Sequence, residues 1–218
     1  MTSKKIQLAN KEKAEGKNIS EKEINEIISL YEGKLEIPVI KNNPQLVLCP
    51  VGLVGAGKTT VTKSISRKLN LLQISTDEIR KILKEKGFNY IKTLKIAIFL
   101  IDKYSKKGYS ICIDADCVSP DTKDYIKNLN KEVKLIDIWI HIKPPEEFII
   151  NKLKNYKHTW LFKDSTEAID NYKRRKPLHK EFASKIDYFY KFDTSKKEIL
   201  NKEINKFVLM IKKKNNTN

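Results

Sequence analysis

Arginine is scarce in this sequence, although the net charge is strongly positive. Lysine and arginine number 44 against 27 acidic residues, a formal charge of +17, and the only arginines are Arg67, Arg80, Arg174 and Arg175. A basic surface can attract RNA, DNA or phosphorylated substrates. Nucleic-acid sites, however, use the planar guanidinium for bidentate and stacking contacts, and these lysines are spread along the whole chain. Nucleic acid is therefore a weakly supported partner, and a compositional bias explains the charge equally well.

Long apolar runs are also missing. No run approaches the roughly 18 residues of a membrane-spanning helix, and residues 1–9 lack the apolar centre of a secretory signal. We expect a soluble, cytoplasmic protein without membrane contact. The 218 residues suit one domain with a terminal extension, because single domains commonly run to about 250 residues.

Cysteine and histidine are few and show no metal-binding spacing. The cysteines are expected to be reduced and structural, and the histidines to be ordinary residues, so that neither a zinc site nor a histidine catalyst is predicted. We assign no role to the loop residue Cys117. The residues concerned are Cys49, Cys112, Cys117, His141, His158 and His179.

One short stretch carries a strong signal for phosphate binding. Residues 52–59 fit the pattern G-x-x-x-x-G-K-[ST], after an apolar run suited to a buried strand and before a segment with helical spacing. Glycines let backbone N–H groups point inward, Lys58 can reach the outer phosphates, and the Thr59 hydroxyl can ligate Mg²⁺. The predicted nucleotide contacts are Gly52, Leu53, Val54, Gly55, Ala56, Gly57, Lys58, Thr59 and Thr60.

Strand and helix patterns alternate along the rest of the chain. Strands are predicted at 46–51, 71–75, 109–114, 133–142 and 188–192, with helices between them. Because such strands need crossovers, we predict an α/β fold of the P-loop NTPase type: three layers, an open and mainly parallel five-stranded sheet, and a small helical lid.

Local signals predict where several helices begin. Thr76 or Asp77 is expected to cap one helix and Ser165 another, and Ser195 to open a capping box before the last. The helix at 90–106 is apolar nearly all round, which predicts burial. No internal repeat is visible.

The amino-terminal part precedes the predicted domain. Residues 1–45 are expected to form an arm and one amphipathic helix, which Ser20 and Glu23 cap and Gly33 ends, with an edge strand at 35–40. The P-loop domain itself is assigned to 46–211 and a basic polar tail to 212–218.

Asp77 and Arg80 follow a strand next to the phosphate loop. A carboxylate there can orient an attacking hydroxyl and take its proton, and Arg80 on the same helix face can hold an anionic group. The alternative is that Asp77 only caps the helix while Arg80 pairs with a surface acid.

Two further carboxylates follow the strand at 109–114. Asp114 has the apolar-run-then-aspartate form that supports Mg²⁺, directly or through water, whereas Asp116 is either functional or an ordinary loop acid.

Arg174 and Arg175 are the lid candidates, because phosphoryl transfer needs positive charge over the equatorial oxygens. Secondary candidates are three lysines that could add charge and an aromatic segment that could exclude water; a solvated basic face and core packing are the alternatives. They are Lys152, Lys154, Lys157 and residues 160–162.

Taken together, the G-x-x-x-x-G-K-T stretch, the strand-end S-T-D-E-I-R and the D-x-D loop resemble the P-loop kinases related to polynucleotide kinase, zeta toxins and chloramphenicol phosphotransferase. The resemblance spans about residues 46–211. It implies ATP, Mg²⁺ and transfer of the terminal phosphoryl group to a hydroxyl, with Asp77 as base, Lys58 on the phosphates and a lid arginine. It also implies that the adenine packs near Asp193 and Thr194.

The sequence departs from that family at one place. Many relatives read D-A-T-N where this chain has Asp114-Ala115-Asp116-Cys117, so an amide and a hydroxyl are replaced by a thiol and a carboxylate. We place Asp116 with Asp77 and Arg80 on the acceptor side. A small-molecule acceptor is favoured over a polynucleotide, and a very anionic one is disfavoured unless Arg80 or the lysines compensate.

Two other functions stay open on the sequence. An ATP-binding or ATP-hydrolysing switch that engages RNA or a protein would keep the phosphate loop and give Asp77 no catalytic role. Growth inhibition by phosphorylating a cellular metabolite would share the kinase chemistry. GTP is less expected, because no Asn/Thr-Lys-x-Asp motif is visible.

Overall fold

Strand β1 (Leu46–Val51) lies at the centre of a five-stranded sheet. A computed structural model describes residues 16–156 and 161–216, and the strand order is β2-β3-β1-β4-β5 with every pair parallel. The other strands are β2 (Leu72–Ser75), β3 (Ile111–Asp114), β4 (Ile136–Ile142) and β5 (Tyr190–Phe192). All six residues of β1 are buried, as expected for a strand covered on both faces. The predicted open parallel sheet is confirmed.

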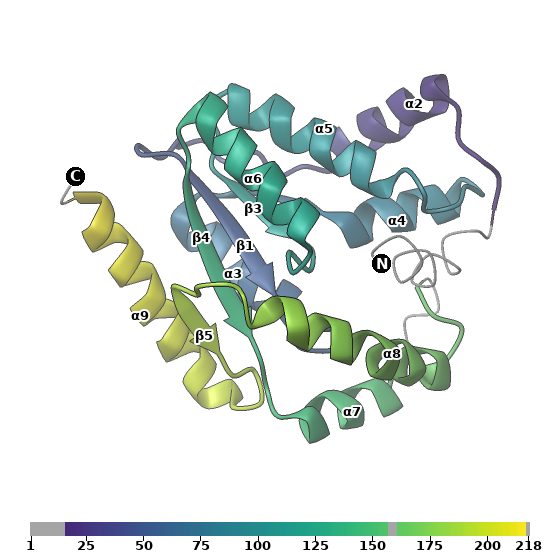
Figure 1. Cartoon of the computed structure of the whole chain (residues 1–218). Helices are drawn as coiled ribbons and strands as arrows, with labels where there is room; N and C mark the ends of the chain where they lie inside the picture. The colour runs from purple at the N-terminus through teal and green to yellow at the C-terminus, as the bar shows by residue number, and fades with distance from the viewer. Residues whose placement is uncertain (1–15, 157–160, 217–218) are drawn as a thin grey trace.

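Helices cover both faces of this sheet (Figure 1). On one face α3 (Lys58–Leu69) and α9 (Lys197–Asn216) pack together over Leu46 and Leu48. On the other face α5 (Thr93–Lys106) and α6 (Pro120–Val133) pack over Val47 and Cys49. Successive β1 side chains point to opposite faces, so one strand supplies both halves of the core. The three-layer prediction is confirmed.

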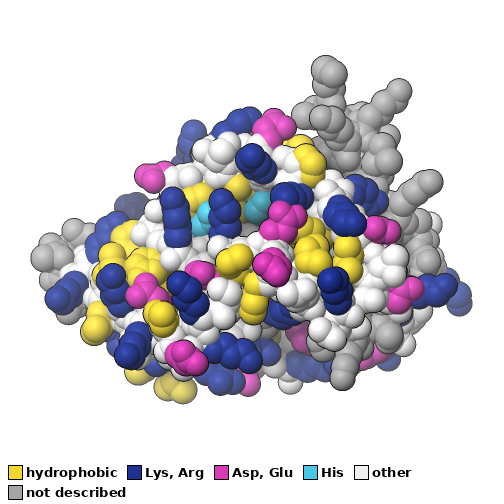
Figure 2. Space-filling view, turned by 90° about the horizontal axis from the view of Figure 1, so that it is seen from below, with side chains coloured by type: hydrophobic (Ala, Val, Ile, Leu, Met, Phe, Trp, Pro, Cys, Tyr) yellow, Lys and Arg dark blue, Asp and Glu magenta, His cyan; other side chains and the backbone are white. Residues whose placement is uncertain are grey.

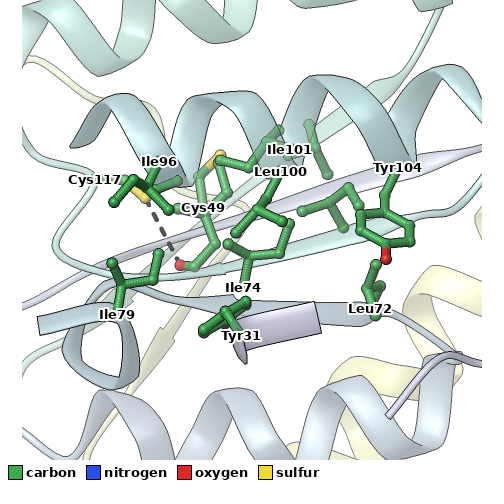
Figure 3. Close-up of a cluster of buried hydrophobic side chains, with 14 of the residues drawn as sticks. Tyr31, Cys49, Leu72, Ile74, Ile79, Ile96, Leu100, Ile101, Tyr104 and Cys117 are labelled. Carbon is green, nitrogen blue, oxygen red and sulfur yellow. Dashed lines mark hydrogen bonds between the residues drawn. The ribbon is translucent and has the colours of Figure 1, made fainter. Parts of the chain in front are cut away.

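The remaining helices lie around these layers. Helices α2 (Glu21–Glu32) and α4 (Thr76–Glu85) pack on each other and on α5, and Figure 3 shows side chains from all three in one buried cluster with β1 and β2. Helices α7 (Glu146–Lys154) and α8 (Ser165–Ala183) pack on each other beyond the carboxyl end of β4 (Figure 1).

The amino-terminal helix belongs to the packed core. Ser20 and Glu23 form the predicted capping box, and Ile24, Ile27 and Tyr31 are buried. Ion pairs join Glu21 to Lys95 and Glu32 to Lys103, both on α5. The tyrosine hydroxyl also accepts a hydrogen bond from the backbone N–H of Ser75, at 2.7 Å.

Two sequence expectations about local structure are wrong. Residues 35–40, all within the described part, form no strand; Val39 is 99% exposed, and Pro38 has no N–H to donate to a ladder. Helix α5 is not buried all round, because Leu94 and Phe99 are 58% and 47% exposed. That helix lies at the outside of its layer, and the ammonium of Lys103 lies over the Phe99 ring.

Two predicted caps are also wrong, by one or two residues. The Ser75 hydroxyl, not Thr76 or Asp77, accepts from the N–H of Glu78, because the α4 helix follows β2 directly. Asp164, not Ser165, caps α8. Ser195 donates its hydroxyl to Asp193, and the capping box expected for α9 stays a prediction. The first of these corrections leaves the Asp77 carboxylate available for other contacts.

Among the described residues, every helix is too short or too polar to span a bilayer.

Candidate nucleotide and acceptor site

The phosphate loop joins β1 to α3. Gly57 is the N-cap residue of α3 with φ 88°, a left-handed conformation that favours glycine, and within the described part of the chain no side chain caps this helix. The first N–H groups of α3 are therefore directed at the loop, where an anion can accept from them. A Cβ atom at Gly57 would lie 3.2 Å from Thr194, so a side chain there would crowd Thr194 as well as strain the backbone.

The side chains of the loop differ in how exposed they are. Leu53 and Ala56 are buried, whereas Thr59 and Thr60 are exposed on the first turn of α3. Val54 and Gly55 are partly exposed. Lys58 Nζ donates to the carbonyl oxygens of Gly52 at 2.7 Å and Leu53 at 3.2 Å, which places its ammonium over the loop.

Thr194 and Asp193 lie beside the loop, after β5. The buried Thr194 hydroxyl donates to the Ala56 carbonyl at 2.7 Å, which fixes the loop backbone. Asp193 is exposed and accepts from the N–H and hydroxyl of Ser195. Thr194 thus contacts the loop directly, and the role of both residues in holding adenine stays a prediction.

Asp114 has the surroundings of a magnesium-supporting carboxylate. Its Oδ1 accepts from the hydroxyls of Thr59 at 3.3 Å and Thr62 at 3.2 Å, and its Oδ2 accepts from Gln73 at 2.8 Å. Burial, opposed by the Gln73 hydrogen bond and assisted by the charge of Asp77, raises the pKa of Asp114. A cation would offset this cost, and the threonine and carboxylate oxygens are hard donors, so the residues fit Mg²⁺.

Two lysines outside the loop add positive charge to the site. Desolvation, together with the charges of Lys58 and Lys197, lowers the pKa of Lys152. The ammonium groups of Lys58, Lys152 and Lys197 repel one another, and a bound polyphosphate would neutralise this repulsion. Sequence reasoning missed Lys197, because lysines are so frequent that none stands out without its position.

Asp77 and Arg80 lie at the same edge of the sheet as Asp114. Ser75 of β2 is in register with Asp114 of β3, and Asp77 follows two residues later. Arg80 Nη1 lies 2.6 Å from Asp77 Oδ1, and the two side chains are 29% and 46% exposed respectively. Arg80 and Asp77 therefore pair with each other. The sequence left open a different arrangement, in which Asp77 caps the helix and Arg80 pairs with another surface acid.

Asp116 is buried under α8 and does not extend into solvent. Its Oδ1 accepts from the Gly52 N–H at 3.2 Å, while Arg175 Nη2 lies 3.5 Å from Oδ2 and His179 Nε2 lies 3.4 Å from Oδ1. Burial acts to raise the pKa of Asp116, but His179 and the charges of Lys58 and Arg175 hold it below its usual value. Sequence reasoning missed His179, although its spacing of four from Arg175 is the helical signal that links them.

The two neighbouring arginines of α8 lie in different surroundings. Arg175 contacts Asp116 beside the loop, whereas Arg174 lines a separate cavity of about 500 Å³ near the start of α8. The acidic lining of that cavity includes Asp164, Glu167 and Asp170.

Only some of the secondary lid candidates lie in the described part of the chain. Lys154 is exposed, and Phe162 is buried against Tyr156. Lys157, His158 and Trp160 lie outside the described residues.

Another histidine lies in the same region. The His141 ring stacks on Tyr188 with a centroid distance of 4.5 Å. Figure 2 views the molecule from the side of α7 and α8, and shows histidine side chains flanked by lysine and arginine in the middle of this face. Acidic side chains lie beside the histidines on the same face, so positive and negative charges are mixed there (Figure 2).

Comparisons with known proteins support the fold. No protein-family model matches the sequence, and no curated protein matches it. Among solved structures, the chain is similar to a candidate kinase from Chloroflexus aurantiacus, with TM-score 0.59 and 14% identity over 78% of this chain and 97% of that one. It is also similar to the PezAT toxin–antitoxin system of Streptococcus pneumoniae, with TM-score 0.55 and 16% identity over 88% and 98%.

A shikimate kinase from Acinetobacter baumannii matches with TM-score 0.47 and 16% identity over 78% of this chain and 95% of that one, and no argument rests on it. At these identities the comparisons show the fold alone. The chain has a P-loop kinase-like fold.

Proposed function

We propose that this protein is an ATP-dependent phosphotransferase that moves the γ-phosphoryl group of ATP to a hydroxyl of an acceptor. The observation that carries the proposal is the shared edge of β2 and β3. There the carboxylate of Asp77 lies close enough to Asp114 to raise its pKa, and Asp114 in turn contacts Thr59 of the proposed phosphate loop. A carboxylate on the acceptor side is what a kinase needs and a simple nucleotide switch does not.

The nucleotide half of the site is assigned to residues 52–60. Lys58, helped by Lys152 and Lys197, would neutralise the outer phosphates, and the α3 N–H groups would donate to them. The adenine is proposed to pack near Asp193 and Thr194. Thr59 and Asp114 would hold Mg²⁺, which when bound draws negative charge from the transferring phosphate.

The acceptor half is assigned to Asp77 and Arg80, with Asp116 behind them. Asp77 would accept the proton of the attacking hydroxyl, and Arg80 would hold the base in place or bind an anionic group of the acceptor. Since Asp116 is held by His179, Arg175 and a backbone N–H, its charge is largely compensated. A small molecule is favoured over a polynucleotide, and kinship with polynucleotide kinase, zeta toxins and chloramphenicol phosphotransferase is part of the proposal.

The test is transfer of phosphate from γ-labelled ATP with Mg²⁺ to panels of nucleosides, 5′-hydroxyl oligonucleotides, nucleotide sugars and alcohols. We expect an acceptor-dependent product that Asp77→Asn reduces by about 10²–10⁴-fold, the range for loss of a general base. Glu78→Gln, a change at the neighbouring exposed carboxylate, is the matched control and should transfer at the parent rate.

Equal transfer by Asp77→Asn and the parent would remove the assigned base. Hydrolysis without any acceptor, stimulated by RNA or protein, would instead favour a switch, and a steep salt dependence of RNA affinity would show that the lysines take part.

A further inference from the structure

Thr194 contacts the phosphate loop from the turn that follows β5. Only 6% of this residue is exposed, and its hydroxyl donates to the Ala56 carbonyl at 2.7 Å. A Cβ atom placed on Gly57 would lie 3.2 Å from Cγ2 and from Oγ1 of Thr194, so the same side chain also lies against Gly57. One threonine therefore contacts both ends of the peptide unit that joins Ala56 to Gly57.

The direction of that peptide unit is not fixed by the loop sequence. Rotating a peptide plane changes ψ of the residue before it and φ of the residue after it, and glycine takes positive and negative φ about equally readily. Gly57 has φ 88°. Because a trans peptide is planar, its C=O and N–H point in opposite directions. The hydrogen bond from Thr194 to the Ala56 carbonyl therefore directs the Gly57 N–H away from Thr194.

The Gly57 N–H is available to a ligand. Within residues 16–156 and 161–216 no backbone or side-chain group accepts a hydrogen bond from it. Successive backbone N–H groups at the start of a helix bind an anion when they converge on it. A reversed peptide at this position would put a carbonyl oxygen where the anion needs a donor. The orientation of one peptide unit thus decides whether the loop accepts or repels a phosphate there.

The turn after β5 gives Thr194 a fixed position. Asp193 Oδ1 accepts from the backbone N–H of Ser195 at 2.9 Å and from its hydroxyl at 2.6 Å, which closes a turn with Thr194 in the middle. On the other side, the Phe192 carbonyl accepts from the Lys143 N–H at 2.9 Å. Since both neighbours of Thr194 are held, its hydroxyl can restrain the loop without moving along with it.

We propose that Thr194 is a positioning residue of the phosphate loop, which keeps the Gly57 N–H directed at the phosphates of a bound nucleotide. Thr194 acts through the Ala56 carbonyl and does not contact the phosphates itself. The inference rests on the proposed function only in requiring that the loop bind phosphates. Because the hydroxyl acts on the loop backbone, its loss should weaken a polyphosphate that carries no base as much as it weakens ATP.

The first experiment measures the binding of inorganic tripolyphosphate and of a non-hydrolysable ATP analogue, each with Mg²⁺ and without acceptor, by titration calorimetry. Thr194→Val keeps the shape of the side chain and removes the hydroxyl. It should weaken both ligands by the same factor, about 10–100-fold, the usual value of one hydrogen bond to a charged group. A loss for the ATP analogue alone would mean that Thr194 acts on the base, and would overturn the proposal.

Two further variants separate the hydroxyl from packing. Thr194→Ser keeps the donor and loses the methyl group, so it should bind tripolyphosphate within about threefold of the parent. A loss in Thr194→Ser equal to that in Thr194→Val would assign the effect to packing and overturn the proposal.

The matched control is Thr93→Val. Thr93 is also buried, with 3% exposed, and its hydroxyl has no hydrogen-bond partner among the described residues. The same loss of a hydroxyl from this position on α5 should leave the affinity for both ligands unchanged. If Thr93→Val weakened them as much as Thr194→Val does, the effect would not belong to the loop and the proposal would be wrong.

The amide NMR signal of Gly57 reports on the peptide directly. In the parent it should shift to lower field when Mg–tripolyphosphate is added, because a new N–H···O bond forms, and Thr194→Val should lose most of this shift. A Gly57 signal that does not respond in the parent would overturn the proposal, even if Thr194→Val does not fold.

The outcomes for the positioning role and for the proposed function can be told apart. Weakened tripolyphosphate binding in Thr194→Val, with no acceptor ever phosphorylated, would contradict only the proposed function. Phosphate transfer by a parent whose Thr194→Val variant binds both ligands equally well would contradict only the positioning role. A parent that binds neither ligand would contradict both.

Discussion

His141 is a single residue through which acid should destabilise the fold. Burial, together with the electrostatic influence of the neighbouring His179, Lys143 and Lys191, lowers the pKa of His141 from 6.5 to about 4. The folded chain therefore keeps this ring neutral, while the unfolded chain protonates it at a higher pH. The stability that this ring contributes is complete above pH 6.5 and is lost as the pH falls towards 4.

We predict that His141→Phe makes the protein less sensitive to acid. Phenylalanine can keep the stack on Tyr188 but cannot titrate. Between pH 7 and pH 4.5 the parent should lose on the order of 2 kcal/mol more unfolding free energy than the variant. Urea unfolding across this pH range measures the unfolding free energy of both proteins. Titrating groups that the two proteins share cancel in the difference. Parallel pH curves for the two proteins would contradict the assignment.

At the scale of elements, α2 supports the strand end next to the proposed acceptor residues. The Tyr31 hydroxyl accepts from the Ser75 N–H at 2.7 Å, and Ser75 in turn caps α4, which holds Asp77 and Arg80. Burial raises the pKa of Tyr31, which keeps the hydroxyl protonated. A helix that precedes β1 in sequence thus supports the strand end next to the proposed acceptor residues.

We predict that Tyr31→Phe lowers the free energy of unfolding by about 1–3 kcal/mol, because it leaves a buried N–H without an acceptor. Leu30→Ala, the neighbouring change at a side chain that is 41% exposed, should stay within about 0.5 kcal/mol of the parent. Denaturant unfolding of the three proteins gives both values. If Tyr31→Phe were as stable as the parent, α2 would not support β2 in this way.

At the scale of the whole molecule, the proposed nucleotide site connects elements from both halves of the chain. The phosphate loop follows β1, its backbone is held by Thr194 after β5, and its first N–H is held by Asp116 after β3. Lys152 on α7 and Lys197 on α9 add charge from two more elements. Ligand binding there should stabilise the entire fold.

We predict that Mg–ATP raises the midpoint of thermal unfolding and that Lys58→Met removes this shift. At a ligand concentration about 100 times the Kd the gain is about 2.7 kcal/mol, or roughly 5–10 °C for a chain of this size. Lys63→Met, at an exposed lysine of the same helix, should keep the shift. Differential scanning calorimetry measures all three proteins, and a shift retained in Lys58→Met would contradict the assigned phosphate contact.

The sequence by itself determined the sheet, the loop and the order of elements. Apolar runs, glycines and helical spacing act over a few residues, so β1, the phosphate loop and α3 could be read directly from residues 46–69. The same local signals predicted that Asp77, Arg80 and Asp114 follow strand ends, and the parallel register then brings them to one edge. The predicted caps of α4 and α8 were wrong by one or two residues, because neighbouring polar residues compete for the same N–H groups.

Only the tertiary structure decided which charges meet. Arg175 and His179 both lie within 4.0 Å of Asp116 because α8 packs beside the loop, and the sequence alone does not specify that packing. The same packing places Arg174 at a separate cavity, away from Arg175, and brings Lys152, out of many lysines, near Lys58 and Lys197. Local patterns fix backbone conformation, whereas electrostatic partners depend on distances between segments far apart in the chain.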